Sequence, residues 1–162
     1  RMKKIMLGFL LFFTLGTATG QDIQKLKITD IEKFIANGNG DILVINFWAT
    51  FCKPCVAEIP FFISTVEKYK SQRVKLMLVS LDMPSYYPAR IASFAKKNKF
   101  KSNIVWLDES NADYFCPKID SAWSGSIPAT LIINTATSSR KFAEEEMTRE
   151  SLEMAIKEVI SK

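Results

Sequence analysis

Residues 41–60 read DILVINFWATFCKPCVAEIP, and this stretch decides the fold. Residues 41–48 form a continuous apolar run rich in β-branched side chains, which is typical of a strand buried on both faces of a parallel sheet. Residues 53–70 follow a helical pattern, so Cys52 and Cys55 fall where a buried strand passes into a helix. Open α/β sheets place ligands and chemistry at this position, at the carboxyl end of a strand.

The rest of the chain continues this alternation of strands and helices. Apolar runs predict further strands at residues 74–81, 104–108, 128–134 and 140–143. Amphipathic spacing and capping residues predict helices at residues 30–36, 88–98, 112–119 and 149–160. The order predicts an α/β fold with a mainly parallel sheet, helices on both faces, and an antiparallel strand and a helix at the end.

The first twenty residues, RMKKIMLGFLLFFTLGTATG, have the pattern of a secretory signal peptide. A basic start precedes an apolar segment at residues 5–15, and Ala18 and Gly20 occupy the −3 and −1 positions of a cleavage site. We therefore predict a signal peptide at residues 1–20 and one domain at residues 21–162. An uncleaved N-terminal membrane anchor is the alternative, and either reading predicts a periplasmic or otherwise exported protein.

Composition removes several classes of function. Three of the 22 basic residues lie in the first twenty positions, which leaves 19 basic against 17 acidic residues. That balance gives no reason to expect nucleic acid as a partner. The chain has no histidine, which excludes Ser/His and Cys/His catalysis and histidine-ligated metals. Three cysteines are too few for a scaffold held together by disulfides.

The cysteine pair has the position of a reactive thiol couple. A cysteine in the first turn of a helix faces unpaired backbone N–H groups and the positive end of the helix dipole, and both stabilise its thiolate. We expect Cys52 to be the exposed nucleophile and Cys55 the buried thiol that resolves a mixed disulfide. Lys53 adds a cation that favours the thiolate, and Pro54 suits an early helical position.

Other uses of the pair fit the sequence less well. A zinc site needs about four ligands, and only Cys116 remains as a sulfur donor. Covalent haem attachment needs a histidine directly after the second cysteine, where Val56 stands. A purely structural disulfide between Cys52 and Cys55 would close almost no loop and so would stabilise little. We therefore predict a redox role with no metal and no cofactor, and a binding module with a structural disulfide stays as an alternative.

A resemblance to a known family narrows the function. Residues 48–55, WATFCKPC, resemble the WAxxCxPC signature of thioredoxin-fold proteins. Together with Glu58, VSLD at 79–82 and SIPATLIIN at 126–134, they resemble the TlpA/ResA-like thiol–disulfide oxidoreductases. The resemblance implies a thioredoxin-like fold, with a central mixed sheet, helices on both faces, and an extra strand–helix insertion after the active-site helix.

The resemblance also implies roles for individual residues. Cys52 and Cys55 would be the redox pair, and Pro128 would follow a cis peptide bond. The backbone of Ile127 would pair with a bound substrate strand, and Trp48 would shield the cysteines and shape the surface around them. The residues expected on the substrate-binding surface are Trp48, Lys53, Pro54, Ile127 and Pro128.

The exchange reaction also needs a proton carrier. Thioredoxins commonly place a buried aspartate two residues before the active-site tryptophan, where this chain has Asn46, which cannot titrate. Glu58, one helical turn beyond Cys55, is the expected substitute, and partial burial would raise its pKa. The alternative is a solvated helix glutamate. We further expect Cys116 to be a buried structural thiol and residues 144–146, three glutamates, to be a solvated connection.

The direction of electron flow follows from the resemblance alone. It points to a reductase of oxidised cysteine-containing exported proteins, apocytochrome c among them, supplied with electrons by a membrane thiol donor. A disulfide oxidase or isomerase is the alternative, because Lys53 would stabilise the reduced thiolate. A thiol peroxidase of the peroxiredoxin type is a third reading. Peroxiredoxins need Thr or Ser three residues before the reactive cysteine, where Ala49 stands, with Thr50 one position later.

Overall fold

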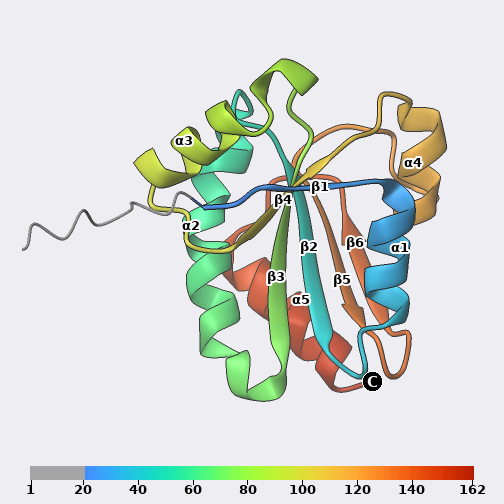
Figure 1. Cartoon of the computed structure of the whole chain (residues 1–162). Helices are drawn as coiled ribbons and strands as arrows, with labels where there is room; N and C mark the ends of the chain where they lie inside the picture. The colour runs from blue at the N-terminus through green and yellow to red at the C-terminus, as the bar shows by residue number, and fades with distance from the viewer. Residues whose placement is uncertain (1–20) are drawn as a thin grey trace, which may run out of the picture.

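A computed structural model describes residues 21–162 and shows a six-stranded mixed sheet between two layers of helices (Figure 1). The strands are β1 (Gln24–Leu26), β2 (Ile42–Trp48), β3 (Val74–Ser80), β4 (Asn103–Leu107), β5 (Ala129–Asn134) and β6 (Arg140–Ala143). The helices are α1 (Ile28–Ala36), α2 (Lys53–Lys68), α3 (Ala89–Lys97), α4 (Ala112–Ile119) and α5 (Arg149–Ile160). The predicted signal peptide lies outside the described residues.

The sheet has the strand order β1-β4-β3-β2-β5-β6. β2 runs parallel to β3, which is parallel to β4, and β4 in turn is parallel to β1. β5 pairs antiparallel with β2 and β6 antiparallel with β5. After the active-site helix α2 the chain forms β3, α3, β4 and α4 in turn, and β4 lies between β3 and β1. The predicted mixed sheet with helices on both faces is confirmed.

β2 lies inside the sheet, and all seven of its residues are buried. Ile45 and Phe47 point to the face covered by α1 and α4. Val44 and Trp48 point to the other face, which α2, α3 and α5 cover. Because side chains alternate along a strand, the polar Asn46 also lies on this second face. The fold therefore buries a polar side chain beneath the helix that carries the cysteine pair.

The structure differs from the predicted elements at the start of the domain. β1 was not predicted, because its three residues, QKL, carry no apolar run and pair only at the sheet edge. α1 begins at Ile28 rather than near residue 30, since the Asp30 carboxylate accepts a hydrogen bond from the Lys27 backbone N–H at 2.9 Å. At the other end, the predicted cap is confirmed: the Thr148 hydroxyl accepts from an N–H in the first turn of α5.

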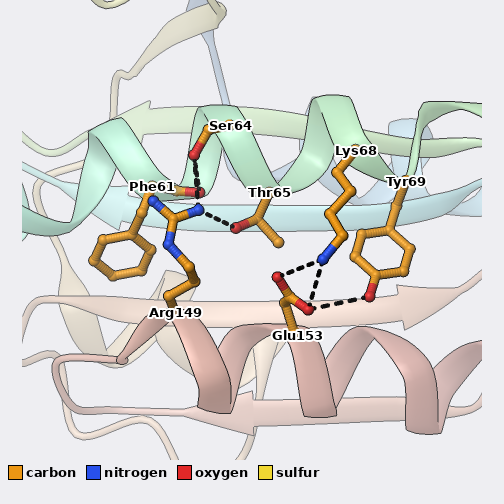
Figure 2. Close-up of polar contacts among 7 residues, drawn as sticks. All are labelled: Phe61, Ser64, Thr65, Lys68, Tyr69, Arg149 and Glu153. Atoms are coloured by element: carbon orange, nitrogen blue, oxygen red, sulfur yellow. Dashed lines mark hydrogen bonds and ion pairs between the residues drawn. The ribbon is translucent and has the colours of Figure 1, made fainter.

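Polar contacts fasten α5 to α2 (Figure 2). The Arg149 guanidinium donates to the hydroxyls of Ser64 at 3.0 Å and Thr65 at 3.4 Å. One helical turn further, Glu153 pairs with Lys68 at 3.0 Å. Surface ion pairs of this kind stabilise a fold little, but they fix how two helices lie against each other. The first turns of α5 are thereby held against the C-terminal part of α2.

Candidate active site

The cysteine pair is present as a disulfide at the first turn of α2. Cys52 caps the helix, and its Sγ accepts a hydrogen bond from the Cys55 N–H at 3.4 Å. Cys52 keeps 9% of its surface exposed, whereas Cys55 is fully buried. An incoming thiol or thiolate can therefore reach Cys52 but not Cys55. This is the arrangement that the predicted order of attack requires.

The turn before Cys52 is held by the buried carboxylate of Asp82. Both carboxylate oxygens accept from the Thr50 N–H at 3.1 Å, and the Thr50 hydroxyl donates to Asp82 at 2.6 Å. The Ser80 hydroxyl donates to the same carboxylate at 2.8 Å. Asp82 was not among the predicted site residues. Two signals pointed to it: Asp82 ends the VSLD segment that carries part of the resemblance, and it is a charged residue two positions after the apolar run of β3.

Ile127, followed by Pro128, lies beside the sulfur of Cys52. The peptide bond between them is cis, as the resemblance implied. The carbonyl oxygen of Ile127 is 3.9 Å from the Sγ of Cys52. Because the oxidised sulfur carries no proton, this is a van der Waals contact rather than a hydrogen bond. Lys53 and Pro54 are exposed in the first turn of α2, directly after Cys52.

Glu58 is fully buried, one turn beyond Cys55 in α2. Its Oε1 accepts a hydrogen bond from the Asn46 amide at 2.8 Å, and its Oε2 accepts from the Met147 backbone N–H at 3.0 Å. The Asn46 amide also donates to the Thr130 hydroxyl at 3.0 Å. The alternative of a solvated helix glutamate is therefore wrong.

Burial raises the pKa of Glu58 to about 7. Loss of hydration disfavours the carboxylate, and this effect exceeds the stabilisation that the two hydrogen bonds from Met147 and Asn46 give to the anion. A carboxyl group with a pKa near neutrality can both release and accept a proton under ordinary conditions. Glu58 thus has the acidity that a proton carrier next to the cysteine pair needs.

Trp48 does not have the surface role predicted for it. It is fully buried, and its ring packs near Phe94 and Phe100, with ring centroids 6.1 and 6.0 Å away. A side chain without exposed surface cannot contact a substrate, so Trp48 supports the cysteine pair from within the core. Two exposed apolar side chains flank the contact between Thr50 and Asp82: Phe51, directly before Cys52, is 64% exposed, and Met83, directly after Asp82, is 53% exposed. Neither exposed side chain was predicted, because the sequence alone does not distinguish an exposed apolar residue from an apolar residue in the core.

The third cysteine, Cys116, is buried in α4 and remains a free thiol, as predicted. Burial raises the pKa of its thiol to about 11, with smaller contributions from Glu144 and Asp113. A thiol this weakly acidic carries almost no thiolate near neutral pH and is therefore unreactive. Within residues 21–162, no group of three or more potential metal-ligating side chains occurs.

Comparison with known proteins places this geometry among redox proteins. The AhpC/TSA family matches residues 13–141. The thiol-disulfide oxidoreductase ResA of Geobacillus kaustophilus is 26% identical, over 91% of this chain and 83% of its own length. Two examples illustrate the solved structures that share the fold. A thioredoxin-related protein from Neisseria meningitidis serogroup B has a TM-score of 0.65 and 24% identity, over 76% of this chain and 87% of its own. StoA from Bacillus subtilis has a TM-score of 0.53 and 27% identity, over 71% and 81%.

Proposed function

This chain belongs to the AhpC/TSA family and carries the cysteine couple of a thiol–disulfide oxidoreductase, and from that premise we propose that it is an exported reductase of protein disulfides. One observation carries the proposal. Of the two cysteines joined at the start of α2, only Cys52 keeps any exposed surface, and Glu58, with a pKa of about 7, lies one turn further along the same helix.

The reaction begins with the pair in its dithiol form. The thiolate of Cys52 attacks one sulfur of a substrate disulfide, which forms a mixed disulfide and releases the other substrate sulfur as a thiolate that takes up a proton. Cys55 then loses its proton and attacks the Cys52 sulfur. This step closes the Cys52–Cys55 disulfide and releases the second substrate sulfur as a thiolate. Two electrons pass from the protein to the substrate, and both released substrate thiolates take up their protons from the solvent.

Glu58 serves the second step. The thiol of Cys55 is buried, so its proton needs an acceptor inside the protein. The Glu58 carboxylate takes this proton and returns it when the pair is reduced again. Its pKa of about 7 lets it do both. The backbone of Ile127, beside the Cys52 sulfur, aligns the substrate strand, while Lys53 and Pro54 border the same surface.

The proposed partners follow from the resemblance to TlpA/ResA-like proteins. The substrates are oxidised cysteine-containing exported proteins such as apocytochrome c, and a membrane thiol donor restores the dithiol. The site is periplasmic or otherwise exported, with residues 1–20 as a signal peptide or an anchor. Within residues 21–162, no helix combines the length and apolarity needed to cross a membrane.

A reduction potential tests the direction. Equilibrium with known ratios of reduced to oxidised dithiothreitol should give a value near that of thioredoxin, about −270 mV, whereas a value near about −120 mV would identify an oxidant. A Cys55→Ala variant should accumulate a mixed disulfide with a protein substrate through Cys52, and Cys52→Ala should not. If neither variant is trapped and the wild type reduces no protein disulfide, the proposed function is wrong.

A peroxidase is the less favoured alternative. The Thr50 hydroxyl, the nearest candidate for orienting a peroxide, donates to Asp82 and lies two rather than three residues before Cys52. Consumption of hydrogen peroxide by the reduced wild type, measured beside the disulfide exchange rate, distinguishes the two activities. We expect exchange with protein disulfides and no rapid turnover of peroxide.

A further inference from the structure

Glu144, directly after β6, is bonded to the loop that leads to Ile127. Its two carboxylate oxygens accept from the Ser124 N–H at 3.1 and 3.0 Å, and one of them accepts from the Ser126 N–H at 2.9 Å. The Ser124 hydroxyl donates to the same carboxylate. Residues 144–146 form a connection between β6 and α5, as predicted, and in addition the Glu144 carboxylate binds three donors from one short loop.

The same loop is fixed from inside the molecule. The indole N–H of Trp123 donates to the Ser126 carbonyl at 2.9 Å. The Trp123 ring is buried and lies 4.4 Å from the ring of Phe47 in β2, measured between centroids. Trp123 thus ties the inner side of the loop to the core. Glu144 supplies the matching contacts on the outer side, and Gly125 between the two serines has a φ of +103° that favours glycine.

The loop ends at the backbone beside the reactive sulfur. Ile127 follows Ser126 directly, and its carbonyl oxygen lies 3.9 Å from the Sγ of Cys52. Among the contacts within residues 21–162, the Ile127 N–H and C=O form no backbone hydrogen bond. These groups are free to pair with an extended peptide, which binds through such unpaired backbone edges. Where that edge lies relative to the sulfur depends on the loop of residues 124–126.

The bonds to Glu144 are of the stronger, charge-assisted kind. Hydrogen bonds from Ser124, and then those from Ser126, lower the pKa of Glu144, so the carboxylate stays ionised under ordinary conditions. Glu145, the next residue, is exposed and makes no side-chain hydrogen bond or ion pair within the part of the chain that the structure describes. The chain therefore offers a matched control: the same residue type and charge at the adjacent position, without the loop contacts.

We propose that Glu144 is a positioning residue for protein substrates: by holding the loop of Ser124 to Ser126, it sets the Ile127 backbone at the distance from Cys52 that a bound peptide strand needs. The proposal rests on the proposed function, because it assigns the Ile127 edge to a disulfide-containing peptide. Glu144 acts through the loop and leaves the chemistry of the sulfurs unchanged. Small dithiols, which need no backbone edge, should not depend on it.

The test compares Glu144→Gln with Glu145→Gln on two substrates. One substrate is insulin, whose interchain disulfides the reduced protein attacks, and the other is dithiothreitol reacting with the oxidised protein. For Glu144→Gln we expect kcat/KM with insulin to fall about fivefold to tenfold, mainly through KM, as when hydrogen bonds that align a substrate are lost. Its rate with dithiothreitol and its reduction potential should match the wild type. Glu145→Gln should match the wild type throughout.

A second measurement, hydrogen exchange, tests whether Glu144 holds the loop. Hydrogen exchange of the Ser124 and Ser126 amides should accelerate in Glu144→Gln and not in Glu145→Gln. An insulin kcat/KM in Glu144→Gln equal to that of the wild type would overturn the inference alone, as would an equal loss with insulin and with dithiothreitol. A wild type that reacts with dithiothreitol but reduces no protein disulfide, neither that of insulin nor that of an exported cysteine protein, would overturn the proposed function, and this inference with it.

Discussion

Replacing Glu58 by glutamine should change how the stability of the protein depends on pH. In the folded protein the pKa of Glu58 is about 7, against an ordinary value of 4.5, because the carboxylate is buried. Glutamine has nearly the same shape and keeps an oxygen that can accept one of the bonds from Asn46 and Met147. The substitution therefore removes the titration with little change in packing.

The sign and size of this effect on the unfolding free energy follow from the pKa values of Glu58 in the folded and the unfolded protein. Because folding raises the pKa, the protonated form favours the folded state. This stability is fully present below about pH 4.5 and is lost as the pH rises through about 7. The difference of the two pKa values corresponds to about 3 kcal/mol of unfolding free energy. Carboxylates with lowered pKa values, such as Asp41 and Glu153, lose their contribution to the unfolding free energy at acid pH. Because the wild type and Glu58→Gln both contain them, they do not affect the difference between the two profiles.

The assay is urea unfolding of the oxidised protein, with the disulfide intact, at several values from about pH 5 to about pH 8. Over this range the wild type should lose about 2 to 3 kcal/mol more unfolding free energy than Glu58→Gln. Glu67→Gln, which alters an exposed glutamate on the same helix, should keep the wild-type profile. Parallel profiles for wild type and Glu58→Gln, within about 0.5 kcal/mol, would refute the reasoning that burial keeps this carboxyl protonated.

Three further predictions concern the surroundings of the site. Asn46→Asp places a second carboxyl within hydrogen-bond distance of Glu58, so the pH-dependent loss of stability should shift to higher pH in the same urea assay, and an unshifted profile would contradict this. Thr148→Ala removes the cap of α5 and should lower the unfolding free energy by about 1 kcal/mol, whereas an unchanged urea midpoint would show that the cap contributes nothing. In the reduced native protein, mass spectrometry after iodoacetamide treatment at about pH 8 should find Cys52 modified and Cys116 not, and modification of both would mean that Cys116 is accessible.

Much of the fold could be predicted because its central elements have strong local patterns. The apolar run of β2 and the helical pattern after it depend only on neighbouring residues, and the structure differs from their predicted bounds by one or two positions. The cap at Thr148 is equally local. β1 could not be predicted, because a three-residue edge strand is defined by its pairing with β4 rather than by its own composition.

The sequence by itself determined that this protein has a cysteine couple at a strand-to-helix junction, no histidine chemistry, and an alternating order of strands and helices. Residue types and their spacing establish these properties, because none of them depends on contacts between residues far apart in the chain. Only the tertiary structure decided that Glu58 is buried against Met147, that Trp48 lies in the core, and that Glu144 binds the loop before Ile127. Glu58 and Met147 are 89 positions apart, so burial and acidity there depend on how α5 packs on α2.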